Sequence, residues 1–375
     1  MTPEERKAKA KAKRKVIRDA QIKRNESMRE YPAKRNIPTD PKDLRDTFIL
    51  YPFELNAKIA EPLEIKEDES LRLIANHLKV FKRCFVPTSH GKDSIVMAHL
   101  IIRAAALVDK PVPDFWLNNT LNLYAEEKPY WDKINDYLGI TDNWKIFMPP
   151  KDKNGNYYTV WSIADEVGHL PNFRHGHIKN TPKDKNGKRK HDGDAPECCD
   201  ILKKDNVNDH LKSIEESERY DCHFVGTRAD ESRNRRLGVL QRCRTYETSS
   251  HKPYAIRTVT PLSFWTDSDI WAYFKKYNIP ENPSYKNHEQ SRLGCASCPA
   301  HLGWELRLAR DPSTVGFGML KMNMKILKKT DQPRFLKSID TLQTAIKKNK
   351  LKPLQVIKVN KMICELTKVN QTTLS

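Results

Sequence analysis

The sequence predicts a doubly wound parallel α/β sheet, because short apolar strands alternate with helical segments along its first half. Strands are expected at residues 80–88, 114–118 and 144–148. Helices are expected between them, at 92–106 and 126–138. Alternation of strand and helix at this spacing is typical of a parallel sheet with helices on its faces.

The alternation of strands and helices resumes after the stretch 151–197. Two further strands are expected at 222–226 and 257–262, followed by an aromatic-rich helix at 267–277. The stretch 151–197 contains Asn-Gly turn signals, and we interpret it as an insertion of surface turns and a basic flap. Residues 71–310, which begin with a helical segment, then form one predicted catalytic domain.

The chain has 375 residues and a net charge of +19, and nearly all of the excess lies at its two ends. Residues 1–35 hold 13 basic and five acidic residues, and residues 313–375 hold 13 and three. We predict a basic arm at 1–35, a lead-in at 36–70 and a basic helical C-terminal region at 311–375. Basic termini favour a polyanionic partner such as nucleic acid, because lysine and arginine release counterions from phosphates. Solvated helix faces are the alternative.

The sequence also carries signals about location. No apolar run of about 18 residues is present, so no membrane span is expected. The N-terminus lacks the apolar stretch of a secretory signal, which predicts a cytoplasmic protein. Its eight cysteines are then expected to be reduced, and to act as metal ligands or catalytic thiols before disulfides.

Four of the cysteines form two tight pairs, Cys198-Cys199 and Cys295-Ala-Ser-Cys298. Four thiolates make a complete ligand set for an iron–sulfur cluster or for zinc. Adjacent cysteines are awkward for one zinc ion, whereas in a cluster each thiolate can bind a different iron. A [4Fe–4S] cluster is therefore favoured, with zinc or no metal as alternatives. The cysteines without partner spacing are interpreted as core or unused thiols; they are Cys84, Cys222, Cys243 and Cys364.

A candidate phosphate-binding loop, Ser89-His90-Gly91-Lys92-Asp93-Ser94, follows the first strand and opens a helix. Gly91 allows close backbone approach, and the helix start offers N–H groups and the positive end of its dipole to an anion. Ser89 and Ser94 can donate hydroxyl hydrogen bonds, and Lys92 can neutralise charge on a departing pyrophosphate. The spacing is not that of a Walker P-loop. An ordinary strand-to-helix turn is the alternative.

This loop resembles the PP-loop of ATP pyrophosphatases, usually Ser-Gly-Gly-Lys-Asp-Ser, and in particular that of the phosphoadenosine phosphosulfate (PAPS) reductase family. The segments Gly226–Arg235 and Pro261–Tyr285 resemble further motifs of that family, in the expected order. The two cysteine pairs resemble the [4Fe–4S] ligands of its cluster-bearing members. The resemblance covers roughly residues 75–305 and implies an adenine nucleotide alpha hydrolase-like fold.

The resemblance implies a substrate, which is ATP with Mg²⁺, or PAPS or adenylyl sulfate (APS). It implies a nucleotide site made of Ser89, His90, Gly91, Lys92, Asp93, Ser94, Asn119, Thr120, Gly226, Arg228, Glu231 and Ser232. The implied catalytic residues are Lys92, Asp93, Arg228 and Arg235. Guanidinium groups after a strand lie at the carboxyl edge of a parallel sheet and suit phosphate or sulfate. Glu231 would orient the two arginines; a solvated turn is the alternative.

Two departures from the family separate its branches. Sulfonucleotide reductases carry a C-terminal Glu-Cys-Gly-Leu-His segment with the attacking cysteine, whereas this chain has only Cys364 in a different context. The intact Gly-Lys-Asp-Ser favours cleavage of ATP between its α and β phosphates. His90 replaces the usual glycine, so a positive φ there would be costly, and the ring would narrow or recharge the phosphate site.

The leading hypothesis is an ATP pyrophosphatase-type sulfurtransferase that resembles those of DNA phosphorothioation or of tRNA thiolation. It would activate a nucleic-acid or other acceptor as an adenylate. Its protein partner would be a sulfur donor or a reductant. One alternative is a PAPS or APS reductase whose reducing thiol is Cys364 or an external partner. The other is a non-catalytic nucleic-acid-binding protein on a nucleotide-binding fold.

Overall fold

The computed structural model describes the chain in six segments, which are residues 50–170, 197–248, 254–288, 293–298, 303–311 and 314–367. The predicted basic arm at 1–35 lies outside them. Residues 36–49 of the lead-in and 171–196 of the insertion also lie outside.

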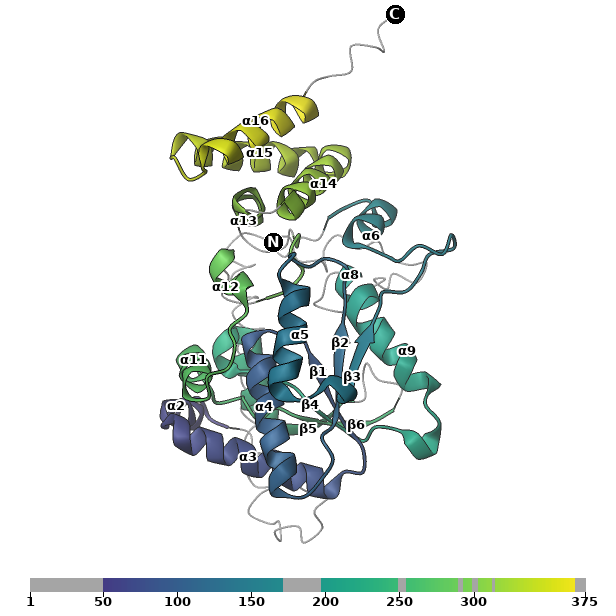
Figure 1. Ribbon diagram of the computed structural model, residues 1–375, viewed down its shortest axis with the longest axis vertical. Helices are drawn as coiled ribbons and strands as arrows, with labels where there is room; N and C mark the ends of the chain where they lie inside the picture. Colours follow the sequence, from purple (N-terminus) through teal and green to yellow (C-terminus); the bar gives the residue numbers. More distant parts are fainter. Residues whose placement is uncertain are drawn as a thin grey trace, which may run out of the picture.

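A six-stranded sheet forms the centre of the fold, in the order β3-β2-β1-β4-β6-β5 (Figure 1). The strands are β1 Cys84–Thr88, β2 Asp114–Asn118, β3 Trp144–Phe147, β4 Cys222–Phe224, β5 Thr245–Thr248 and β6 Ile256–Val259. All neighbours pair in parallel except β5, which pairs antiparallel with β6 at the edge. The predicted parallel sheet is confirmed, and β5 is a strand that the sequence pattern did not indicate.

Helices precede, connect and follow these strands. Around the sheet they are α2 Pro52–Ala60, α3 Leu63–Val80, α4 Lys92–Leu107, α5 Glu127–Leu138, α6 Val160–Val167, α9 Asn206–Ser213, α10 Arg233–Arg242, α11 Asp267–Lys276 and α12 Pro283–Asn287. The described part of the lead-in is therefore helical, and α3 occupies the start of the predicted first strand. In the described segments, no helix has the length and apolarity needed to span a bilayer.

The strands alternate their side chains between two apolar layers. Val86 of β1 and Phe115 of β2 belong to the layer that α3, α4 and α5 cover. Phe85 and Trp116, the residues beside them, stack at 4.0 Å between ring centroids on the opposite face. There they meet Leu211 of α9. Helices on both faces of the sheet make the fold doubly wound.

The C-terminal helices lie beyond one end of the sheet, where α14 packs against α6 (Figure 1). They are α13 Trp304–Arg310, α14 Thr314–Thr330, α15 Gln332–Lys347 and α16 Pro353–Thr367. Their buried residues share one apolar cluster with Cys198 and Ala296, which belong to the two cysteine segments. The basic C-terminal region is thus helical, as predicted, and it packs directly on the predicted sulfur site.

The strand order creates a switch point between β1 and β4. From β1 the chain crosses to β2 and β3 on one side, while β4, β6 and β5 lie on the other. Ligands of open α/β sheets bind beside the carboxyl ends of strands at such a point. The loops that follow β1 and β4 are the predicted phosphate loop and the segment that begins at Gly226.

Candidate active site

A cavity of about 400 Å³ lies at this switch point. Three groups of predicted residues form much of its wall: the phosphate loop, the loop after β4 and both cysteine pairs. Its lining includes Ser89, Gly91, Asp93, Ser94, Gly226, Thr227, Glu231, Arg235, Tyr285, Cys198, Cys199, Cys295, Cys298 and Lys203. Segments more than 200 residues apart in the chain therefore enclose one space, which the predicted phosphate loop and four thiols share.

The phosphate loop is held by its own hydroxyls and by a distant tyrosine. The Ser89 and Ser94 hydroxyls lie 3.2 Å apart, and the Ser89 backbone N–H donates to Ser94 Oγ at 3.3 Å. The Lys92 N–H, at the start of α4, donates to the Tyr285 hydroxyl at 2.7 Å. A Cβ on Gly91 would lie 3.2 Å from Ser89 Oγ and 3.4 Å from this hydroxyl. One of the expected anion donors is thus taken by Tyr285, which itself lines the cavity.

Gly226 brings the loop after β4 against the start of α4. A Cβ at this position would lie 3.3 Å from the Asp93 carbonyl oxygen and 3.6 Å from the Ser94 backbone nitrogen. A contact that short is tighter than an ordinary van der Waals contact, and backbone atoms cannot easily move away. Glycine therefore lets the two loops close one wall of the cavity.

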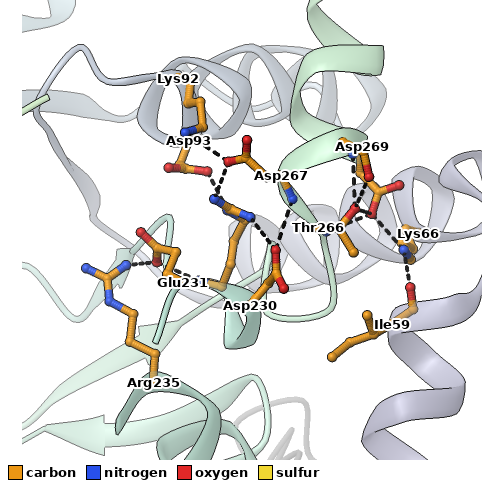
Figure 2. Close-up of polar contacts among 12 residues, drawn as sticks. Ile59, Lys66, Lys92, Asp93, Asp230, Glu231, Arg235, Thr266, Asp267 and Asp269 are labelled. Atoms are coloured by element: carbon orange, nitrogen blue, oxygen red, sulfur yellow. Dashed lines mark hydrogen bonds and ion pairs between the residues drawn. The ribbon is translucent and has the colours of Figure 1, made fainter. Parts of the chain in front are cut away.

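Lys92 and Arg228, two predicted catalytic cations, are buried in an ion-pair network behind that wall. Lys92 Nζ lies 2.9 Å from Asp267 Oδ1 (Figure 2). Arg228 Nε lies 2.5 Å from Asp93 Oδ1, and its Nη2 lies 3.0 Å from the same Asp267 oxygen. Burial alone would raise the pKa of Asp267, but its bonds to Lys92 and Arg228 lower it overall. In the described structure neither cation belongs to the cavity lining.

Arg235 is the predicted arginine that does line the cavity. It pairs with Glu231, one helical turn earlier, which also lines it (Figure 2). Ser232 caps α10 by accepting the Arg235 N–H on its Oγ at 3.3 Å. Ser232 therefore positions Arg235 through the backbone, and it is not part of the described lining.

Lys203 is a site residue that the sequence analysis missed. It lies in a π-helical turn, Asp200–Asp205, directly after the adjacent cysteines, and it lines the cavity. The charges of Cys295, Cys199, Cys298 and Cys198 raise its pKa against the effect of burial. The sequence could have indicated Lys203 as a neighbour of the thiols, because it lies four residues after Cys199 and residues at that spacing share a helix face.

The four predicted metal ligands converge on the cavity. Cys198 is buried, and its hydrogen bond with Cys199 lowers the pKa of Cys199 to about 6. The Cys295 thiol donates to Thr120 Oγ1 at 3.5 Å. In the described segments, no three His, Cys, Asp or Glu side chains are arranged so that they could hold a metal ion. The structure therefore shows four thiols that share one cavity, without a preformed single-ion site among the described residues.

Asn119 and Thr120, predicted to contact the nucleotide, lie beside the cavity and not in its described lining. Asn119 Oδ1 accepts the Leu121 N–H at 3.0 Å, which forms a local turn after β2. Thr120 is buried against Cys295. Thr120 thus contacts the thiol segment, whereas Asn119 shapes the turn after β2.

His90 adopts a positive φ of 51°, as the family's glycine suggested, but its ring does not enter the phosphate site. It stacks on Trp131 at 5.4 Å and meets Trp144 edge-on at 4.3 Å. Its Nε2 lies 3.2 Å from Asn135 Oδ1. Burial lowers the pKa of His90 to about 4. The ring is therefore neutral at physiological pH, and it anchors the loop to α5 without narrowing or recharging the cavity.

This burial predicts a loss of stability in mild acid. The unfolded chain binds a proton near pKa 6.5, whereas folded His90 does so only near 4. Acidification from pH 6.5 to 4 therefore favours the unfolded state by up to about 3 kcal/mol. His90→Asn keeps a residue that tolerates positive φ. It should be less stable at pH 7 but lose less stability on acidification, as measured by urea unfolding. Parallel pH profiles for the two proteins would contradict this assignment.

Comparisons with known proteins agree with the sequence resemblance. A family model described as the phosphoadenosine phosphosulfate reductase domain matches residues 169–301, which include all four cysteines of the cavity. Adenosine 5'-phosphosulfate reductase of Burkholderia cepacia is 28% identical over 101 residues, covering 27% of this chain and 35% of that protein. Sulfate adenylyltransferase subunit 2 of Xanthomonas euvesicatoria pv. vesicatoria is 24% identical over 242 residues, covering 60% and 67%.

A solved structure, phosphoadenylyl-sulfate (PAPS) reductase from Candida auris, is similar at 14% identity and a TM-score of 0.38. It covers 64% of this chain and 93% of the reductase. The chain spans about a third of the length of the Burkholderia reductase and two thirds of the adenylyltransferase subunit. It is thus similar to enzymes of sulfur metabolism that are named for adenylyl sulfates and adenylyl transfer, and it carries a PAPS reductase domain match over its thiol-bearing part.

Proposed function

We propose that the protein binds ATP in the switch-point cavity and cleaves it to AMP and pyrophosphate, activating an acceptor for sulfur transfer. One observation carries the proposal: the phosphate loop and the four cysteines line the same cavity of about 400 Å³. A site built only for nucleotide would not need four thiols, and a thiol site alone would not need a phosphate loop. Their juxtaposition suits a reaction in which an activated oxygen meets sulfur.

The phosphate end of the cavity would be formed by Ser89, Ser94, Gly226 and Arg235. The serine hydroxyls can donate to phosphate oxygens, and the Arg235 guanidinium can bind two of them at once. Mg²⁺ would enter with the phosphates of ATP. The adenylyltransferase similarity supports this direction, because that enzyme's name denotes transfer of an adenylyl group to sulfate.

At the other end, the four cysteines would hold a [4Fe–4S] cluster. Cys198, Cys199, Cys295 and Cys298 supply the four thiolates that such a cluster requires, and Lys203 offsets their negative charge. When bound, a cluster of this kind supplies iron sites that bind sulfur or transfer single electrons. The chain's own contribution is to gather the thiols in the cavity that the phosphate loop also lines.

The acceptor is proposed to be nucleic acid, as in the phosphorothioation and tRNA-thiolation enzymes that the sequence resembles. The acceptor oxygen would attack the α phosphate and pyrophosphate would leave. A sulfide-level sulfur nucleophile supplied by a donor protein would then bond to the activated acceptor atom and displace AMP, which carries away the acceptor oxygen. The basic ends of the chain, with 13 Lys and Arg residues each in 1–35 and 313–375, suit such an acceptor.

A reductase acting on APS or PAPS is the second candidate, favoured by the similarity to APS reductase. Its reducing thiol would have to come from a partner. Cys364 is exposed on α16, and in the described structure it is not part of the cavity lining. For this second candidate the reductant is therefore proposed to be an external thiol and not Cys364.

Product analysis separates these candidates. Full-length protein, purified without oxygen, is incubated with ATP, Mg²⁺ and DNA or RNA, or with APS or PAPS and a thiol reductant. AMP and pyrophosphate are expected from ATP, with formation stimulated by the acceptor. Sulfite release would establish the reductase instead, and neither product would indicate a binding protein.

The phosphate site is tested by a matched pair of neighbouring arginines. Arg235 lines the cavity, whereas Arg236 bonds to Asn56 of α2 on the surface. Arg235→Ala should lower kcat/KM for ATP by roughly tenfold or more, the scale of a lost charged hydrogen bond. Arg236→Ala should leave kcat/KM unchanged. Equal effects would argue against the proposed phosphate site.

A further inference from the structure

The Cys295–Cys298 turn is held by its own backbone hydrogen bond and by hydrogen bonds from other segments of the chain. The Cys298 N–H donates to the Cys295 carbonyl at 3.0 Å and closes the turn. The two residues between them, Ala296 and Ser297, are at most 1% exposed. Their backbone groups are out of reach of bulk water, so they need partners inside the protein.

On the sheet side, Asn122 supplies three of these bonds. Its carbonyl oxygen accepts the Ala296 N–H at 2.8 Å, and its Oδ1 accepts the Ser297 N–H at 3.0 Å. Its Nδ2 donates to Ser297 Oγ at 2.7 Å. Asn122 follows β2 by four residues, so this side of the turn is tied to the sheet edge.

On the opposite side, the C-terminal helices supply the partners of the turn's carbonyls. Asn323 of α14 donates from Nδ2 to the Ser297 carbonyl at 2.8 Å. Arg307 of α13 donates from Nη2 to the Ala296 carbonyl at 3.1 Å. Behind Asn323, the Trp161 indole N–H of α6 donates to Asn323 Oδ1 at 2.9 Å. The Asn323 amide therefore joins α6, α14 and the cysteine turn.

Asn323 is an unusual residue for its place in the fold. It is 0% exposed and lies on the buried face of α14 beside Leu320, Met324 and Leu327, which belong to the shared apolar cluster. A buried amide costs stability unless its polar atoms are bonded, and here both its oxygen and its nitrogen are. An apolar residue at this position would leave the Ser297 carbonyl without this donor.

We propose that Asn323 is a positioning residue that sets the placement of Cys295 and Cys298 in the cavity. Through Trp161 it also ties the turn to α6, which packs in the same apolar cluster as Cys198. The C-terminal helices are thus a structural part of the thiol site. The inference rests on the proposed sulfur function for its purpose, but its test measures thiol placement without ATP, so the two can fail separately.

The test is the reactivity of individual cysteines in the full-length chain after any bound metal has been removed with a chelator. Alkylation by iodoacetamide is followed by peptide mass spectrometry. In Asn323→Ala, Cys295 and Cys298 should react about tenfold faster, the scale of one lost buried hydrogen bond. Cys84 and Cys222, buried in the sheet core, should react at the wild-type rate.

Ser338→Ala is the matched control. Ser338 is buried in α15 and donates to Glu305 of α13 at 2.9 Å, so its loss also removes a buried bond from the helical region. This variant should also lower the Tm, but it should keep wild-type rates at Cys295 and Cys298. Equal acceleration in both variants, or at all cysteines, would overturn the proposal and make Asn323 a purely structural residue.

Trp161→Phe provides an independent variant should Asn323→Ala not fold. It keeps an aromatic ring but removes the N–H that orients the Asn323 amide. Cys295 and Cys298 should again react faster than in wild type, by a smaller factor than in Asn323→Ala. Wild-type rates at both cysteines would show that the relay from α6 does not position the turn.

Discussion

Cys295→Ser should leave the protein unable to retain iron. Wild-type chain purified without oxygen is expected to be brown and to contain about four irons per chain, the content of one [4Fe–4S] cluster. Cys295 lines the cavity with Cys198, Cys199 and Cys298, so its loss removes one of four converging thiolates. A serine hydroxyl is not deprotonated at neutral pH and does not replace a thiolate ligand. Iron analysis and visible absorbance measure the effect, and Cys198→Ser should have the same result.

Cys364→Ser is the control for this experiment. Cys364 is exposed on α16, so its replacement should leave the iron content unchanged. A colourless wild-type protein with one zinc ion would refute the cluster and favour a structural metal. Iron loss of equal size in Cys364→Ser would show that the loss does not report on the cavity.

Lys92→Ala should lower kcat/KM for AMP formation. The decrease should correspond to a loss of about 2–4 kcal/mol of transition-state stabilisation, the scale expected when a preorganised charge is removed. Lys92 Nζ pairs with Asp267, whose carboxylate side chain is 52% exposed. Lys92 itself is buried, but solvent reaches the Asp267 carboxylate, so that carboxylate stays hydrated when the ammonium turns to phosphate. We therefore expect the ammonium to leave Asp267 for the departing pyrophosphate.

Lys66→Ala separates this role from a structural one. Lys66 is also a buried lysine, and its Nζ lies 2.7 Å from Asp269, two residues beyond Asp267 in α11 (Figure 2). Its removal should destabilise the fold by a similar amount and leave kcat/KM unchanged. Urea unfolding and steady-state kinetics on both variants decide the matter: a Lys92→Ala protein that is destabilised yet fully active would restrict Lys92 to bracing the loop.

The fold and the meeting of the predicted segments followed from local patterns. The strand at 114–118 was predicted at its observed bounds, because an apolar run between turn residues defines it. The phosphate loop and the Gly226 segment were placed at one sheet edge because parallel strands end there. Strand order does not explain why the cysteine pairs share a cavity with them, because one pair lies in α8 (Glu197–Cys199) and the other follows α12.

Side-chain directions were harder to predict, because they depend on partners far away in the chain. Lys92 and Arg228 turn to Asp267, and only the packing of α11 on α4 brings that carboxylate close. The direction of His90 depends in the same way on Trp131 and Trp144, which form a pocket for its ring. Local sequence identifies the type of residue at each position, whereas the fold decides which way it points.

The apolar cluster shared by Cys198, Ala296 and the C-terminal helices limits how this protein can be divided. A chain that ended at residue 310 would expose Ala296 and the buried face that Leu320 and Leu327 now cover. The C-terminal helices are therefore not a separable unit of the fold. Under the proposed function, variation that changes the acceptor would have to fall on outward positions of these helices, such as Leu354 and Ile357, which are each 63% exposed. Such variation would act by surface substitution and not by domain exchange.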